Sequence, residues 1–252
     1  FFENGIFEIY KNHVLAVNNF ERHCCDLWVS TDFQENNLII GSIALKHFNI
    51  FISNYGYYTL HASAFYADDF SVICSAQGGN GKSTIIYQAQ KLGYSLSADD
   101  RTIIDSHKWE LLNCFSSIGL DYSLRSPPRL TDFSVISEAT EAHKTYYCVQ
   151  KISNMCETKP LHVSVLLFPE LGDGPPSASL ITPENAYRRL LMNNSYMAQI
   201  YSKAYFSFLL GLAKRSVSFH VMLNRTTKSY QFIDEFLKQM RREKNESNIN
   251  KS

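Results

Sequence analysis

The chain has 252 residues, of which 45% are hydrophobic and 13% aromatic, and it carries 24 basic and 24 acidic side chains. This composition is typical of a globular protein with a sizeable core, and it argues against disorder and against residence in a membrane. Because the charges balance, nothing supports a general affinity for nucleic acid or anionic membranes. The six cysteines form no C-x-x-C pair, and we recognise no secretory signal, so we expect a reducing, cytoplasmic setting.

The first part of the chain predicts a small α+β subdomain over residues 1–55. Short apolar runs separated by Asn, Asp and Gly in residues 1–37 indicate an antiparallel layer of strands. From Asn37 to Ser53 the apolar positions recur at helical spacing. We expect the main domain to occupy residues 56–243 and a disordered polar tail to occupy residues 244–252.

The next elements predict a strand, a glycine-rich loop and a helix in succession. The runs "YYTLHASAFYADD" and "FSVICSA" read as two strands joined by a turn at residues 68–69. The helix after the glycines ends at Gly93, a residue suited to a left-handed stop. Further short strands follow in "YSLSADD" and "TIIDSHKWELLNC", the latter with a hairpin at "DSHK".

The second half predicts alternating strands and helices. The prolines of "RSPPRLTD" indicate an irregular loop, "LHVSVLLFPE" a core strand, and "LGDGPPSAS" a surface loop. A helix begins at Thr182 and Pro183, and its spacing continues toward Leu212; a strand "VSFHVML" and an amphipathic helix through Met240 follow. The fold class is therefore α/β, a mixed sheet with helices.

The stretch "SAQGGNGKST", residues 75–84, holds three glycines, a lysine and two adjacent hydroxyl residues. It matches the P-loop template, except that Ala76 replaces the first glycine, which is tolerable if φ there is not positive. In such a loop the backbone amides face phosphate oxygens, Lys82 bridges the terminal phosphates, and the Ser83 hydroxyl binds magnesium. A plain turn capped by Ser83 is the alternative, but it has no use for a cation at a helix start. We predict nucleotide binding by Gln77, Gly78, Gly79, Asn80, Gly81, Lys82, Ser83 and Thr84.

Two adjacent carboxylates, Asp99 and Asp100, end the next short strand, seventeen residues after Lys82. Phosphoryl transfer to an alcohol needs a metal tether and a carboxylate that accepts the hydroxyl proton. Neighbouring side chains on an extended backbone diverge, so one carboxylate would face the metal and the other the substrate. The alternative is a solvated turn. His61, in "LHAS", is by itself more typical of a core histidine than of a site residue.

Together, "LHAS", "AQGGNGKST" and "LGYSLSADD" resemble the kinase domain of HPr kinase/phosphorylase, with twenty-one residues from His61 to Lys82 and seventeen from Lys82 to Asp99. They are more similar still to the shorter HPr-kinase-like proteins found beside lasso-peptide genes, the precursor-peptide serine kinases. The resemblance covers about residues 58–105. It implies a fold like the nucleotide-binding domain of phosphoenolpyruvate carboxykinase, with magnesium and ATP bound by the P-loop. The glycine-rich signature that follows the aspartate pair in bacterial HPr kinases has no counterpart in this sequence, so the resemblance does not identify HPr as the substrate.

The resemblance also implies roles for single residues. Asp99 would be the general base on the acceptor hydroxyl, Asp100 a metal-associated carboxylate beside Ser83, and His61 would line the γ-phosphate side. An arginine that clamps the transferring phosphoryl group is expected on electrostatic grounds. The "PPRL" stretch resembles a P-R-L element of the lasso-associated relatives and makes Arg129 the first choice. The other candidates are Arg101, Arg125, Arg188 and Arg189.

We therefore expect an ATP- and magnesium-dependent kinase that phosphorylates a hydroxyl, with Ser or Thr of a peptide or protein as the expected acceptor. A kinase for a small hydroxylated metabolite and an ATP-binding regulatory protein without phosphoryl transfer stay as alternatives. No nucleic acid or membrane partner is expected. Relatives of this type often assemble, which leaves a homo-oligomer open.

Overall fold

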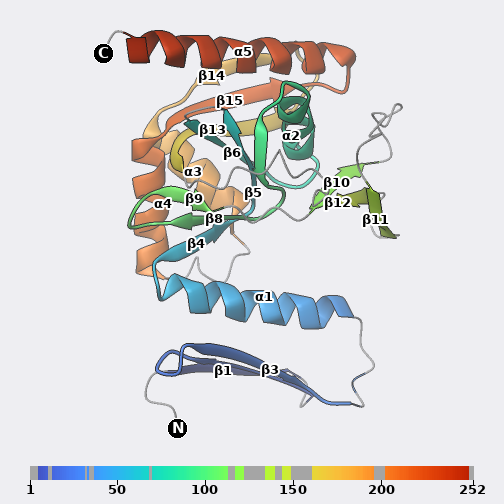
Figure 1. Ribbon diagram of the computed structural model, residues 1–252, viewed down its shortest axis with the longest axis vertical. Coiled ribbons are helices and arrows are strands. Elements are labelled where there is room, and N and C mark those ends of the chain that lie inside the picture. The colour runs from blue at the N-terminus through green and yellow to red at the C-terminus, as the bar shows by residue number, and fades with distance from the viewer. Residues whose placement is uncertain are drawn as a thin grey trace.

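The computed structural model describes residues 5–10, 13–31, 33, 37–67, 70–112, 117–121, 134–139, 144–148, 161–195 and 202–249. Figure 1 shows the N-terminal sheet and α1 at one end of the molecule and α5 at the other. The helices are α1 (Asn37–Ser53), α2 (Lys82–Lys91), α3 (Pro183–Asn193), α4 (Lys203–Arg215) and α5 (Thr227–Ile249).

The N-terminal strands form a layer of their own. β1 (Gly5–Tyr10), β2 (Val14–Asn19) and β3 (Cys24–Val29) make an antiparallel sheet in that order. Helix α1 packs on this sheet through a small core that contains Val14, Ala16 and Ile43. The strands and the helix predicted for this region are thus confirmed, while the domain boundary at residue 55 stays a prediction.

Over the part of the chain that the structure describes, the main sheet has nine strands and mixes parallel with antiparallel pairs. Its order is β4-β8-β9-β13-β6-β5-β7, with β15 paired to β13 and β14 paired to β15. Strands β6, β13 and β15 run parallel, so their carboxyl ends meet at one edge. The strand bounds are β4 Tyr57–Leu60, β5 Ala62–Ala67, β6 Phe70–Ser75, β7 Ser95–Ala98, β8 Thr102–Asp105, β9 Glu110–Leu112, β13 Leu161–Leu171, β14 Ser177–Leu180 and β15 Val217–Leu223.

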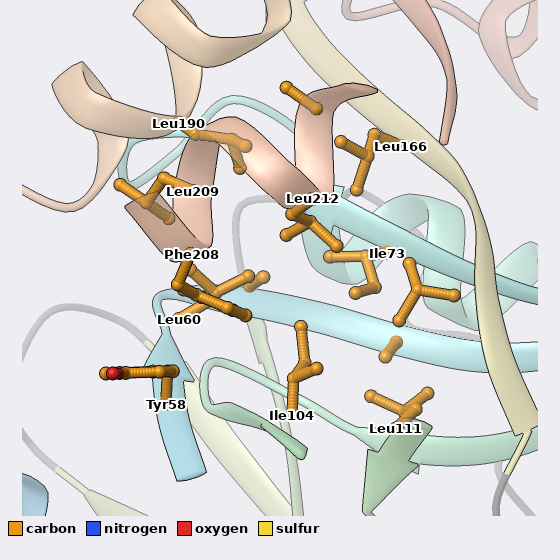
Figure 2. Close-up of a cluster of buried hydrophobic side chains, with 14 of the residues drawn as sticks. Tyr58, Leu60, Ile73, Ile104, Leu111, Leu166, Leu190, Phe208, Leu209 and Leu212 are labelled. Atoms are coloured by element: carbon orange, nitrogen blue, oxygen red, sulfur yellow. The ribbon is translucent and has the colours of Figure 1, made fainter. Parts of the chain in front are cut away.

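Helices cover both faces of the parallel strands, which explains why β6 is buried along its whole length. Along β6, Ile73 joins a core with α3 and α4, whereas its neighbours Val72 and Cys74 join a core with α2 and α5. Figure 2 shows the first core, in which Leu190 of α3 and Leu212 of α4 lie over the sheet. The mixed α/β class predicted from the sequence is therefore confirmed.

Two features differ from the prediction. Residues 177–180, expected as part of a loop, form β14, because their backbone pairs antiparallel with β15 from Ser177 to Leu180. The single helical stretch expected from Pro183 toward Leu212 is two helices, α3 and α4, since α3 ends at Asn193 and Ser202 caps a new helix by accepting from the Tyr205 N–H. Strand β13, by contrast, matches the predicted core strand "LHVSVLLFPE" and continues through Pro169, where its β6 partner has already ended.

The carboxyl-terminal helix and the middle third of the chain also contain structure that the sequence did not predict. Helix α5 extends to Ile249, beyond residue 244 where the sequence predicted a disordered tail. In the middle third, β10 (Ser117–Asp121), β11 (Ser134–Ala139) and β12 (Lys144–Cys148) form a separate antiparallel sheet in the order β10-β12-β11. The predicted "RSPPRLTD" loop lies outside the described residues. Within the described residues, each helix is too short or too polar to cross a membrane.

Candidate active site

The glycine-rich loop joins the carboxyl end of β6 to the start of α2, as the sequence predicted. Its backbone is left-handed at Gly79, with φ of +81°, and at Gly81, with φ of +94°. The conformation at Gly81 favours glycine, and a Cβ added there would lie 2.9 Å from Cδ1 of the buried Leu223, which would have to shift. Ala76 is not among the described non-glycine residues with positive φ, so alanine fits its position.

The start of α2 is suited to an anion. Gly81 occupies the N-cap position, and among the described residues no side chain caps this end of the helix. The first amides of a helix have no partner within the helix, and the helix dipole adds positive potential at the same place. Backbone donors that a capping side chain would otherwise occupy are therefore available to a phosphate group.

Lys82 is the first residue of α2 and is almost buried, with 7% of its surface exposed. Its Nζ folds back across the loop and donates to the carbonyl oxygens of Ala76 at 2.7 Å and Gln77 at 3.4 Å. A buried ammonium beside the positive end of a helix costs free energy, which a bound polyphosphate would offset. The position therefore favours an anion site over a plain turn.

Asp99 follows β7 and reaches the loop from the neighbouring strands. Its Oδ1 accepts from Ser63 Oγ at 2.6 Å and from Ser83 Oγ at 3.4 Å. The Asp99 carboxylate and the Lys82 ammonium act in opposite directions on the Cys74 thiol, whose pKa is raised chiefly by burial. Lys82 lowers that pKa and Asp99 raises it, so both charges lie near the end of β6.

Asp100 turns the other way. Its φ is +68°, and its side chain is 60% exposed. Its Oδ1 lies 2.8 Å from Nε2 of His61, whose side chain is 13% exposed. Strained backbone persists where surrounding contacts hold it, and it gathers at functional sites. The two carboxylates thus diverge: Asp99 contacts the loop serine and Asp100 contacts His61.

The structure brings together five residues that the sequence predicted for the site: His61, Lys82, Ser83, Asp99 and Asp100. His61 lies 39 residues from Asp100 along the chain, and the sheet closes that distance. Arg129, the predicted phosphoryl clamp, lies outside the described residues, as does Arg125.

The remaining arginine candidates are spread over the fold. Arg101 and Arg188 are exposed. Arg189 Nη1 lies 3.3 Å from Glu170 Oε2, and His220 Nε2 lies 2.9 Å from the same oxygen. Burial raises the pKa of Glu170, but the hydrogen bonds from Arg189 and His220 outweigh it and lower that pKa overall. Arg189 is therefore engaged with a carboxylate in this structure.

Three residues of the site were missed by the sequence analysis. Ser63 donates to Asp99, and it lies two positions after His61 in the same "LHAS" motif. Asn193 Nδ2 donates to the carbonyl oxygen of Ser75, and Asn194 Oδ1 accepts from the His61 N–H. The place of Ser63 in the "LHAS" motif could have identified it from the sequence, whereas no local pattern marks Asn193 or Asn194.

The donors present fit a magnesium ion held jointly by protein and substrate. Ser83 and Asp99 supply a hydroxyl and a carboxylate oxygen 3.4 Å apart. Among the described residues no group of three or more His, Cys, Asp or Glu side chains forms a metal cage. Magnesium is usually held by one or two carboxylates together with substrate phosphates, so no such cage is needed.

An exposed glycine-rich loop followed by a buried lysine, a helix start without a side-chain cap among the described residues, and two diverging carboxylates lie together on an α/β fold, an arrangement suited to a phosphate-type anion. A scan of protein-family models found no match, and a search of curated proteins found none either. Among solved structures, the chain is similar to the Hpr(Ser) kinase/phosphatase from Coxiella burnetii at 12% identity and a TM-score of 0.38. The match covers 74% of this chain and 98% of that chain. This likeness is too remote to carry a conclusion about activity.

Proposed function

We propose that the protein is an ATP- and magnesium-dependent kinase that transfers the γ-phosphate to a hydroxyl group. The observation that carries the proposal is the division of the two carboxylates. Asp99 lies 3.4 Å from the loop serine, Ser83, whereas Asp100 lies 2.8 Å from His61 and is exposed. Nucleotide binding alone would use only the first carboxylate, Asp99, beside the loop serine. The second, paired with a histidine beside the loop, suits the proton of an acceptor hydroxyl.

The phosphate side consists of the loop amides, Lys82 and Ser83. The backbone of residues 77–84 binds the phosphate oxygens, and Lys82 exchanges its carbonyl partners for the terminal phosphates. Ser83 and Asp99 would hold the magnesium ion, which, when bound, neutralises charge that develops on the phosphates. Lys82 and the amides orient the nucleotide with its γ-phosphate toward the two carboxylates.

The contacts favour a division of roles opposite to the one expected from the sequence. The motif resemblance implied Asp99 as general base and Asp100 as the metal-associated carboxylate. Asp99, however, already shares a hydrogen bond with the proposed magnesium ligand Ser83, and a second with Ser63. Asp100 is the more accessible of the two to an acceptor. We therefore assign the metal side to Asp99 and the acceptor side to Asp100 with His61.

In the transfer step, the acceptor oxygen forms a bond to the γ-phosphorus while the bond from that phosphorus to the bridging oxygen of ADP breaks. The proton of the acceptor hydroxyl passes to the Asp100 carboxylate. His61, through Nε2, orients that carboxylate. The products are a phosphate ester and ADP, and no other reactant is needed.

A serine or threonine of a peptide or protein is the acceptor that the motif resemblance supports. The test is incubation with radiolabelled ATP and magnesium against a randomised Ser/Thr peptide library, an Ala-substituted library and a panel of small hydroxylated metabolites. Label in the Ser/Thr library alone supports a peptide kinase. Label in a metabolite alone identifies the small-molecule alternative. Nucleotide binding without any labelled product would contradict kinase activity and favour a regulatory ATP-binding protein.

A further inference from the structure

The carboxyl end of α3 lies between the two halves of the site. Asn193 Nδ2 donates to the carbonyl oxygen of Ser75 at 2.9 Å, and Ser75 is the last residue of β6 before the glycine-rich loop. Asn194 Oδ1 accepts from the backbone N–H of His61 at 2.7 Å. These contacts bridge 118 and 133 residues of chain. Adjacent residues of one helix end therefore contact the phosphate side and the acceptor side.

Asn194 is buried and forms hydrogen bonds through both polar atoms of its side-chain amide. It is fully buried, with 0% of its surface exposed. Its Nδ2 donates to the carbonyl oxygen of Leu190 at 2.8 Å, while its Oδ1 serves His61. Leu190 itself is buried in the core between α3, α4 and the sheet (Figure 2). The amide is thus fixed by the core at one end and presents an acceptor to His61 at the other.

The backbone N–H of His61 needs a hydrogen-bond acceptor because the residue lies at a break between two strands. It falls between β4, which ends at Leu60, and β5, which begins at Ala62. Leu60 pairs with Thr102 and Ala62 pairs with Ser75, so the chain changes its strand partner at His61. The Asn194 oxygen satisfies the His61 N–H at this break. The direction of the imidazole toward Asp100 depends on how the backbone is held there.

We propose that Asn194 is a positioning residue for the acceptor side of the reaction. It fixes the backbone of His61 so that Nε2 meets Asp100, while Asn193 fixes the start of the phosphate loop from the same helix end. This inference rests on the proposed kinase function. In this proposal, the carboxyl end of α3 holds the His61–Asp100 pair and the phosphate loop in a fixed relative position. Asn194 acts through His61 and not by contact with the nucleotide or the acceptor.

The test compares Asn194→Ala with Asn185→Ala, a control at an exposed position of the same helix. Small displacements of catalytic groups cost up to about a hundredfold in rate, so we expect Asn194→Ala to lower kcat about ten- to a hundredfold. The KM for ATP should stay within about twofold, because the loss falls on the transition state and not on nucleotide binding. Asn185→Ala should match the wild type.

A double mutant separates positioning from a general loss of stability. If Asn194 acts through His61, adding Asn194→Ala to His61→Ala lowers kcat no further. An unchanged kcat in folded Asn194→Ala, or losses that multiply in the double mutant, would overturn the proposal. If Asn194→Ala does not fold, Asn194→Ser decides, since its hydroxyl can still donate to the Leu190 carbonyl oxygen four residues earlier while the shorter side chain withdraws the oxygen from the His61 N–H. Its kcat should fall at least about tenfold, and a kcat within about threefold of wild type contradicts the inference.

Failure of the kinase hypothesis is distinguishable from failure of this inference. A wild-type protein that neither transfers phosphate nor hydrolyses ATP contradicts the proposed function. The structural step is then measured without turnover, from the imidazole NMR signals of His61. Asn194→Ala should displace those signals and Asn185→Ala should not. Signals that are unchanged in folded Asn194→Ala show that the asparagine does not position His61.

Discussion

Replacing the loop glycines one at a time separates backbone strain from steric contact. Gly78 has no positive φ and a Cβ there would meet nothing within 4 Å. At Gly79 φ is +81° and the space is open, whereas at Gly81 φ is +94° and a Cβ would lie 2.9 Å from Leu223 Cδ1. Gly78→Ala therefore carries neither cost, and Gly79→Ala carries the conformational cost alone. Gly81→Ala carries the conformational cost together with a steric contact.

The magnitudes follow from these geometries. Gly78→Ala should stabilise the protein by about 0.4–1 kcal/mol, because alanine restricts the unfolded chain. Left-handed backbone costs a non-glycine residue about 1–2 kcal/mol, so Gly79→Ala should be less stable than Gly78→Ala by that amount. Leu223 is only 1% exposed and cannot move aside freely. Overpacking adds about 1–3 kcal/mol, which places Gly81→Ala about 2–5 kcal/mol below Gly78→Ala.

The measurement is the free energy of unfolding in urea, with calorimetric titration of magnesium-ADP on each folded variant. We expect the order Gly78→Ala, Gly79→Ala, Gly81→Ala from most to least stable, and the weakest nucleotide binding in Gly81→Ala. Equal stability of the Gly81 and Gly78 variants would refute the assigned loop conformation. Unchanged nucleotide affinity in Gly81→Ala would instead show that the loop takes no part in nucleotide binding.

Three further results are expected. Lys82→Ala should weaken magnesium-ATP binding at least about tenfold in a calorimetric titration, because removing a charged hydrogen-bonding partner costs about 1.5–3 kcal/mol. Asp100→Asn should abolish transfer while keeping the magnesium dependence of nucleotide binding, and Asp99→Asn should weaken that dependence; the reverse pattern would restore the roles that the motif implied. Glu170 has a pKa below its ordinary value of 4.5, so its contribution to stability is present above that value and is lost as the pH falls through the lower folded-state pKa. Urea titrations of Glu170→Gln should therefore show a shallower loss of stability in acid than the wild type, and a parallel loss would contradict the pairing with Arg189.

The sequence by itself determined the local parts of this protein. Helical spacing located α1 and α2, the capping residue Thr182 located the beginning of α3, and short apolar runs located β6, β7 and β15. Glycine, lysine and serine at fixed offsets identified the loop, because a phosphate cradle needs residues that follow one another along the chain. The aspartate pair was found for the same reason.

Only the tertiary structure decided which distant residues meet. The contacts of Asp99 with Ser63 and Ser83 depend on β7 lying beside β5, and no local pattern specifies that strand order. The contact of Asn194 with His61 spans 133 residues and joins the end of a helix to a break between strands. Local chemistry can therefore indicate that a nucleotide binds. Which carboxylate lies beside the loop serine and which beside the histidine follows from the register of the sheet, because adjacent side chains at a strand end point to opposite neighbours.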